Sequence, residues 1–200
     1  MCIRDSRRID ATSGLVAGDT SALVAADTMS YKTIVELKAF AKDQYIRGMR
    51  GQGNEEMFHF FVTPQVMADL KLDSDFLSNV RSAGVRGPNN ELFAGSSSLM
   101  VDGVMVHEFR HVPNTSQGTS GTQKGGSGSD VDFAANLFCG AQSLAMADIG
   151  LPEIVEDTFD YGNQNGISIG KIMGLKKPVY NSDISGQDED FGVIRVDCAF

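Results

Sequence analysis

Hydrophobic positions near the start of the chain first follow a helical spacing and then a strand-like one. A helix is predicted that is capped by Asp27 or Ser30 and runs to about Gln44. Its apolar stripe comprises Ile34, Leu37, Phe40 and Ala41. Residues 57–62 then form a short, nearly continuous apolar run that includes His59, and this run predicts a buried strand in which the histidine packs in the core.

Two further helices are predicted directly after this strand. Thr63-Pro64 is a helix start, because a hydroxyl can cap the first turn and proline suits the first helical position. The inner face of that helix would comprise Val66, Met67 and Leu70. A second helix that begins at Asp73 or Ser74 would bury Phe76, Leu77 and Val80.

The second half of the chain mixes strand signals with one alanine-rich segment. Asp102-Gly103 is a hairpin signal, and strict alternation of apolar and polar residues follows it as far as Val112. Alanine-rich residues 133–149 predict a helix that ends at Gly150, and residues 167–172 and 191–198 predict two strands. Because strands and helices do not alternate regularly, the sequence predicts an α+β fold.

Three segments lack any such pattern. Residues 7–28 are small and polar, which predicts extended chain or loop, and residues 82–98 predict an irregular excursion. Residues 114–130 are rich in glycine, serine and threonine, and 114–129 contain no aliphatic or aromatic side chain, so we expect a mobile loop on an assembled surface.

Length and charge restrict the class of protein. Two hundred residues suffice for one domain with a core, and no apolar run approaches the roughly 20 residues that span a bilayer. The net charge of −9 is uneven, with +2 over residues 1–50 and −11 over the remainder. Tight nucleic-acid binding needs a basic face, so direct recognition of DNA or RNA is disfavoured. We therefore expect neither a membrane partner nor sequence-specific contact with nucleic acid.

One short motif could carry catalysis. Residues 107–111 match H-E-x-x-H, in which a helix brings His107 and His111 to one zinc ion while Glu108 activates a bound water. Here the alternation predicts a strand, Pro113 would interrupt a helix, and in a strand the two histidines would lie about 13 Å apart. A zinc-dependent metallopeptidase that uses these three residues is therefore the alternative hypothesis and not the preferred one.

Other candidate chemistry is weaker still. Lys124 has no glycine at the P-loop position, and Gly125 follows it where serine or threonine is needed. The three cysteines, Cys2, Cys139 and Cys198, are widely spaced and indicate buried or incidental thiols. Two clusters of carboxylates are interpreted as solvated loops. The first comprises Glu153, Glu156, Asp157 and Asp160, and the second comprises Asp183, Asp188, Glu189 and Asp190. We predict no catalytic residue, no metal site and no cofactor.

The order of the segments, in contrast, resembles one protein family. Residues 58–70 resemble a strand-then-helix signature of the major capsid proteins of tailed phages, of the family typified by coliphage N-four. Further segments resemble that family in the same order, namely residues 90–95, 101–108, 137–145, 159–163, 167–177 and 190–194. The resemblance spans about residues 30–200.

This resemblance implies a structural protein and not an enzyme. It implies a Hong Kong 97-like fold, present here in part as the A-domain and part of the P-domain, and a subunit that assembles with copies of itself into an icosahedral shell around phage DNA. Implied partners are other copies of the chain and portal, scaffold or decoration proteins. The implied location is the virion, after assembly in the host cytoplasm. A head decoration or tail protein is a third possibility.

Family members are about twice as long as this chain. We therefore expect residues 7–200 to be the C-terminal portion of a major capsid protein and residues 1–6 to be a non-native leader. On that basis, the family's N-terminal arm, extended loop and spine helix are missing, and some apolar surface here is an interface without its partner.

Overall fold

In the computed structural model, the described residues are 6–51, 55–83, 98–115, 124–181, 188–190 and 192–200. Within them, eight strands form one mixed sheet, and these strands are β1 (Ser6–Asp10), β2 (Gly14–Ala17), β3 (Met49–Arg50), β4 (Glu56–Val62), β5 (Ser98–Val101), β6 (Val104–Glu108), β7 (Phe133–Cys139) and β14 (Val193–Ala199). Their order is β2-β1-β14-β7-β4-β6-β5, and β3 pairs with β4. The β1–β14 and β4–β6 pairs are parallel, whereas the other pairs are antiparallel.

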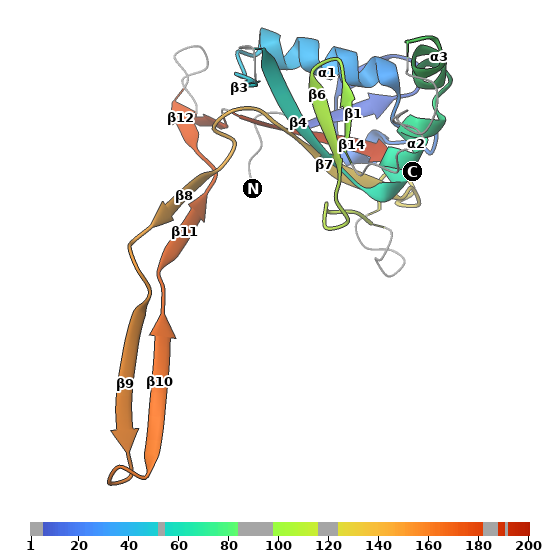
Figure 1. Cartoon of the computed structure of the whole chain (residues 1–200). Coiled ribbons are helices and arrows are strands. Elements are labelled where there is room, and N and C mark those ends of the chain that lie inside the picture. Colours follow the sequence, from blue (N-terminus) through green and yellow to red (C-terminus); the bar gives the residue numbers. More distant parts are fainter. Residues whose placement is uncertain (1–5, 52–54, 84–97, 116–123, 182–187, 191) are drawn as a thin grey trace. The chain divides into compact units, whose positions relative to one another are not determined.

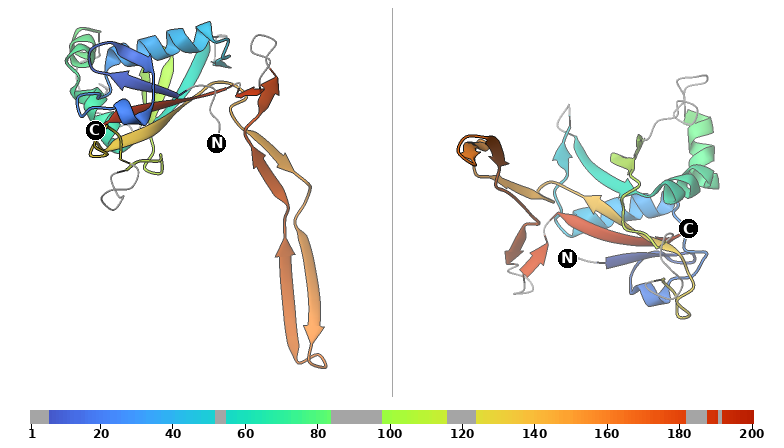
Figure 2. Two further views of the ribbon diagram at one scale, coloured as in Figure 1. Left: turned by 180° about the vertical axis from the view of Figure 1, so that it is seen from behind. Right: turned by 90° about the horizontal axis from the view of Figure 1, so that it is seen from below.

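Helix α1 (Tyr31–Asp43) packs along this main sheet, as Figures 1 and 2 show. Ser30 is its N-cap, and the Ser30 hydroxyl accepts a hydrogen bond from the Thr33 amide at 3.4 Å. Of the predicted stripe, Ile34, Leu37 and Ala41 are fully buried, whereas Phe40 is only half-buried. This helix therefore follows the sequence prediction at its start, along most of its apolar face and at its end.

Helices α2 (Pro64–Leu72) and α3 (Ser74–Ala83) follow β4 directly. Thr63 and Pro64 begin α2 as predicted, but the Thr63 hydroxyl makes no capping bond and is buried without a described partner. The predicted inner faces are confirmed in α2 and are only partly buried in α3, where Phe76 is 4% exposed and Leu77 and Val80 are half-buried. None of the described helices is long and apolar enough to cross a membrane.

The core lies between the helices and one face of the main sheet. Phe58 and Phe60 of β4 are fully buried and contact Phe138 of β7, with ring centroids 5.1 and 5.9 Å apart. Ile194, Val196 and Cys198 of β14 are also fully buried, and Asp197 and Ala199 of the same strand are buried as well. Aromatic side chains from neighbouring strands thus form the centre of the core.

The β5–β6 hairpin turns at the predicted dipeptide. Asp102 and Gly103 both have positive φ, at 46° and 76°, between the paired residues Val101 and Val104. A two-residue turn with two positive φ angles matches the right-handed twist of the strands, and glycine adopts it without steric cost.

The strand after this turn is shorter than predicted. Strand β6 ends at Glu108, because the Phe109 amide donates the last bond of the β4–β6 ladder to Val62 at 2.8 Å. Residues 110–111 then form a turn, and Pro113 has no amide hydrogen with which to extend the ladder. The predicted strand over residues 104–112 is therefore correct only for its first half.

The predicted alanine-rich helix over residues 133–149 is wrong. This segment forms strand β7 and the separate strand β8 (Ala145–Asp148). Strand β7 lies between β14 and β4 and pairs with both, so the sheet contacts on its two sides override the helix propensity of alanine. Ala134, which is fully buried, faces the core next to the paired Cys198.

The chain divides into two units, of which the second is Leu144–Pro178. This second unit is a two-stranded antiparallel ribbon, in which β8 pairs with β11 (Met173–Lys176) and β9 (Glu153–Phe159) pairs with β10 (Gln164–Gly170). The strand predicted over residues 167–172 is thus displaced, because Lys171 and Ile172 lie between β10 and β11. The first unit, Met1–Ser143 and Val179–Phe200, also contains the small β12–β13 pair (Val179–Asn181 and Asp188–Asp190).

Several sequence predictions fall partly outside the described residues. The predicted excursion 82–98 includes residues 84–97, the glycine-rich loop 114–130 includes residues 116–123, and the expected leader includes residues 1–5, all of which lie outside them. At the described ends of the glycine-rich loop, Asn114 pairs with Ala134 and Gly125 pairs with Val131. The segment 7–28, predicted as extended chain or loop, contains β1 and β2.

Candidate functional site

The H-E-x-x-H residues do not converge on one point. His107 and Glu108 end strand β6, whereas Arg110 and His111 lie in the turn beyond it. The His107 ring stacks on Phe61 at 5.2 Å between ring centroids, and the His111 ring meets Phe109 edge-on at 5.4 Å. Because the segment is not helical, the i, i+4 geometry that a zinc peptidase needs is not formed here.

His107 instead pairs with His59, which is half-buried and not the core residue that the sequence predicted. The two imidazoles stack at 5.0 Å with an angle of 4° between their planes, and His59 Nδ1 lies 2.8 Å from His107 Nε2. Register explains the contact, because Phe61 lies opposite His107 and His59 lies one pleat away on the same face. Burial, and secondly the charge of His59, lower the pKa of His107, so the structure favours its neutral form.

The described residues do not assemble a metal site around this pair. No three or more His, Cys, Asp or Glu side chains among them are arranged to hold an ion. Cys139 lies opposite His59 in the sheet, and burial raises the pKa of the Cys139 thiol, which disfavours the thiolate that a metal would need. What the face offers is a half-buried cluster of imidazole, aromatic and thiol groups.

The remaining sequence candidates are dispersed. Lys124 forms an ion pair with Asp132, with 3.0 Å between Nζ and Oδ2, and does not belong to a phosphate-binding loop. Glu153, Glu156 and Asp157 lie on strand β9 and Asp160 lies in the turn after it, so the prediction that this acidic cluster is a solvated loop is wrong for its first three members. Of the second acidic cluster, Asp188, Glu189 and Asp190 form strand β13, and Asp183 lies outside the described residues, as does Cys2.

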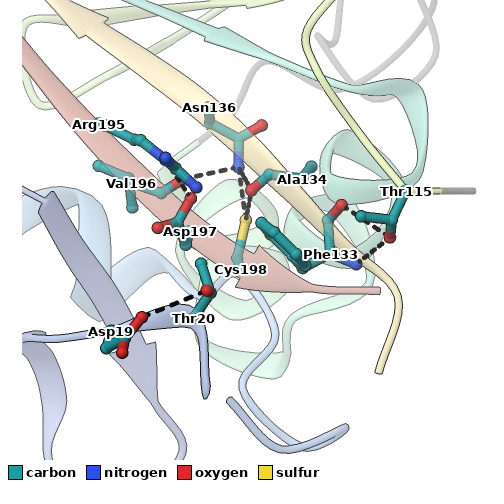
Figure 3. Close-up of polar contacts among 10 residues, drawn as sticks. All are labelled: Asp19, Thr20, Thr115, Phe133, Ala134, Asn136, Arg195, Val196, Asp197 and Cys198. Atoms are coloured by element: carbon teal, nitrogen blue, oxygen red, sulfur yellow. Dashed lines mark hydrogen bonds and ion pairs between the residues drawn. The ribbon is translucent and has the colours of Figure 1, made fainter. Parts of the chain in front are cut away.

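A buried polar network ties the central strands together, as Figure 3 shows. The side chain of Asn136 on β7 is fully buried, and its amide nitrogen donates to the carbonyl of Val196 at 3.3 Å and contacts the Cys198 sulfur at 2.5 Å. Its amide oxygen accepts from the backbone N–H of Thr63 at 3.4 Å. Sequence analysis missed this role of Asn136, because its partners Thr63, Val196 and Cys198 come from distant parts of the chain.

The charged pair drawn in Figure 3, Arg195 and Asp197, also has a structural role. Asp197 is 1% exposed, and its carboxylate receives the Nε–H of Arg195 at 2.7 Å. Burial raises the pKa of Asp197, and the Arg195 contact opposes that rise. Burial also strongly raises the pKa of the Cys198 thiol, so this sulfur is neutral and unsuited to nucleophilic chemistry.

The most extensive exposed apolar surface described is on the ribbon of the second unit. Its exposed apolar side chains include Met146, Ile154, Val155, Phe159, Ile167, Ile169, Met173 and Leu175, each at least half exposed. The alternation in Ile167-Ser168-Ile169 predicted a strand at this position, but it did not indicate that the isoleucine side chains would be exposed. Exposed apolar surface of this kind is typical of a contact site, for which another polypeptide is one candidate partner.

Together, the main sheet and the ribbon define a mixed α+β protein with one markedly apolar exposed segment. Comparison with known sequences identifies its kind: the family described as phage capsid protein matches residues 7–200. The major capsid protein of Pseudomonas phage KPP25 is 53% identical over 178 residues, which are 88% of this chain. The chain therefore belongs to the phage capsid protein family.

Solved structures agree with this assignment. The capsid of Ralstonia phage GP4 matches with a TM-score of 0.60 and 26% identity, over 92% of this chain and 50% of that one. The capsid of cyanophage Pam1 has a TM-score of 0.69 at 23% identity, over 90% and 49%, and shows the shared fold. The chain spans 47% of the length of its curated relative, about half.

Proposed function

We propose that this chain is the C-terminal portion of a major capsid subunit that assembles with copies of itself into the icosahedral head shell of a tailed phage. The observation that carries the proposal is the 53% identity to a major capsid protein over 88% of the chain. The proposal places the protein in the virion after assembly in the host cytoplasm, around DNA that it does not read. Portal, scaffold or decoration proteins are its further partners.

In this proposal the fold is Hong Kong 97-like and the family is the one typified by coliphage N-four. The chain then comprises the A-domain and part of the P-domain. The ordered set of resembling segments over residues 58–194 supports both assignments. We further propose that residues 7–200 are the native portion, after a leader at 1–6. The family match over residues 7–200 is compatible with this division.

The physical argument for self-association comes from the ribbon. An isolated two-stranded ribbon is marginally stable in water at best, because it has no core of its own. None of its residues 144–178 is buried. A subunit that places such a ribbon against its neighbours would gain stability only when the shell forms.

The proposal also makes the protein non-enzymatic. The alternative, a zinc peptidase that uses His107, Glu108 and His111, would need paired imidazoles. These side chains instead contact different partners, namely Phe61 and His59 for His107 and Phe109 for His111. Shell formation requires only complementary surfaces repeated by symmetry.

Expression of the complete gene product followed by electron microscopy tests the proposal. Closed icosahedral shells are expected. Tubes, or particles that form only on shells supplied by another protein, would instead indicate a tail or head decoration protein. Metal analysis tests the enzyme alternative separately, because stoichiometric zinc that is lost in His107→Ala would overturn the structural assignment.

A further inference from the structure

The ribbon of residues 144–178 has one strongly apolar face. In the β9–β10 ladder, Ile154 lies opposite Ile169 and Ile167 lies opposite Glu156, so three isoleucines share one face. All three are more than 60% exposed. The opposite face carries two apolar side chains, Val155 and Phe159, and the Phe159 ring covers Gly166, since a side chain added at that glycine would lie 2.7 Å from the ring. The isoleucine face has no such cover within the ribbon.

The β8–β11 ladder repeats this asymmetry. Met146 lies opposite Leu175, and Met173 lies opposite Asp148, so three more apolar side chains share one face. The reverse face carries Ala145, Ala147, Gly174 and the charged Lys176. Apolar clusters of similar size thus occupy the two halves of the ribbon, three isoleucines in the half that contains the turn and two methionines with a leucine in the other.

Charge divides the ribbon at the same place. The turn half, residues 149–170, carries four carboxylates, Glu153, Glu156, Asp157 and Asp160, and no lysine or arginine. The other half, residues 144–148 and 171–178, carries Lys171, Lys176 and Lys177 against the single acid Asp148. The two halves therefore have formal charges of −4 and +2.

We propose that the ribbons of two copies of this chain pack against each other antiparallel across a two-fold axis, with the isoleucine cluster of each copy on the methionine–leucine cluster of the other. This inference rests on the proposed function, because a closed shell supplies two-fold axes between copies. It names a contact that the proposed function leaves open.

Charge complementarity selects both the occupant and the direction. In an antiparallel pair, the acidic half of each ribbon faces the basic half of its partner, and two-fold symmetry makes every such contact twice. A parallel pair would place like charges together along the whole length, which is unfavourable. Glu156, on the isoleucine face, and Lys171, which bonds Asp148 at 2.8 Å beside the other cluster, are the groups that we expect to meet.

Charge reversal in the complete gene product tests the pairing. Glu156→Lys reverses the acid on the isoleucine face, and Lys171→Glu reverses the lysine beside the methionine–leucine cluster. Each substitution alone should lower the yield of shells about tenfold or more, and the two combined should restore it to within about twofold. Asp43→Lys, at an exposed acid of the first unit, is the matched control and should leave the yield unchanged.

A cysteine pair tests the direction without depending on yield. Met146 and Ile167 lie about eight residues apart along one ribbon, or roughly 27 Å, too far for a disulfide within the chain. Met146→Cys with Ile167→Cys should give disulfide-linked dimers in oxidised shells, whereas either substitution alone should give none. Restored assembly in the combined reversal variant, or a cross-link in the cysteine variant, would also show that a loss of shells in the single variants is not caused by misfolding.

The outcomes separate the two proposals. Shells that form normally with Glu156→Lys, or that give no cross-link, overturn the ribbon pairing and leave the shell function in place. Single reversals that impair assembly without restoration in the combined variant also overturn it, because the ribbon then covers some other segment. A complete gene product that forms no shells overturns both.

Discussion

Replacement of Asn136 should show how far one buried amide determines the stability of the main sheet. The side chain is fully buried on the central strand β7, and it is the described acceptor for the backbone N–H of Thr63, which is also fully buried. In Asn136→Ala this N–H loses its acceptor in the interior. A donor in that position is costly because it has left water without gaining a protein partner.

The expected magnitude follows from these contacts. An unsatisfied buried N–H costs about 1–3 kcal/mol, and loss of the amide group leaves a small cavity worth about 1 kcal/mol more. The removed amide no longer has to be satisfied itself, which offsets part of this cost. We therefore expect the free energy of unfolding to fall by about 2–3 kcal/mol, a large share of the roughly 5–15 kcal/mol typical of a domain.

Urea titration followed by circular dichroism would measure this loss. Asn165→Ala, the same substitution at an exposed position of β10, is the matched control and should change stability by less than about 0.5 kcal/mol. Asn136→Asp should be more destabilised at pH 7 than at pH 4, since burial raises the pKa of the new carboxyl and folding then favours its protonated form. Equal, small losses in Asn136→Ala and Asn165→Ala would refute the reasoning.

Four other substitutions test separate features by the same titration. Phe138→Ala should cost about 3–5 kcal/mol because the ring is fully buried between two phenylalanines, whereas Phe109→Ala, half exposed, should cost little; equal losses would contradict the assigned core. Gly103→Ala should cost about 1 kcal/mol through its positive φ alone, since the added Cβ meets only ordinary contacts; no loss would argue against the turn. Thr63→Val should be neutral or stabilising, because it removes a buried hydroxyl without a described partner. The pKa of His107 is lowered from 6.5, so the free energy of unfolding should be highest above pH 6.5 and should fall as pH drops toward the folded-state pKa. The slope should be at most about 1.4 kcal/mol per pH unit. His107→Gln should reduce this slope, and an unchanged slope would rule out His107 as its source.

The sequence predicted those elements whose local pattern and final packing agree. Helix α1 has a cap, a stripe and an end that all indicate the same segment, and its stripe meets the sheet as expected. The Asp102-Gly103 turn was predictable because the positive φ angles it needs are a local requirement. In both cases the information lies within a few residues along the chain.

Strand β7 shows where local pattern fails. Phe133, Ala134 and Asn136 suit a strand here only because β14 and β4 lie on either side, and those neighbours come from distant parts of the chain. Strand β9 was missed for a different reason. Its acidic residues resemble a solvated loop, and its pairing with β10 appears only when the ladder register is known.

The candidate chemistry shows the same limit. Period-two alternation correctly indicated that His107 and Glu108 lie on a strand, which was enough to disfavour a zinc helix. It could not place His59 against His107, because that contact depends on the parallel register between β4 and β6. It also predicted a strand as far as Val112, although the last ladder bond is made by Phe109.

The two units differ in what stabilises them, and this difference bears on assembly. The first unit has its own core of buried aromatic and aliphatic side chains, whereas none of the residues of the ribbon is buried. Burial of one isoleucine, leucine or methionine side chain is worth about 1.5–3 kcal/mol, so the six apolar residues of the proposed ribbon contact represent roughly 10 kcal/mol or more before the entropy cost of association. That free energy becomes available only when the ribbon meets a partner. If the proposed contact forms, ordering of the ribbon and association of the subunits are coupled, and the charge pattern that selects the partner also selects when the ribbon becomes stable.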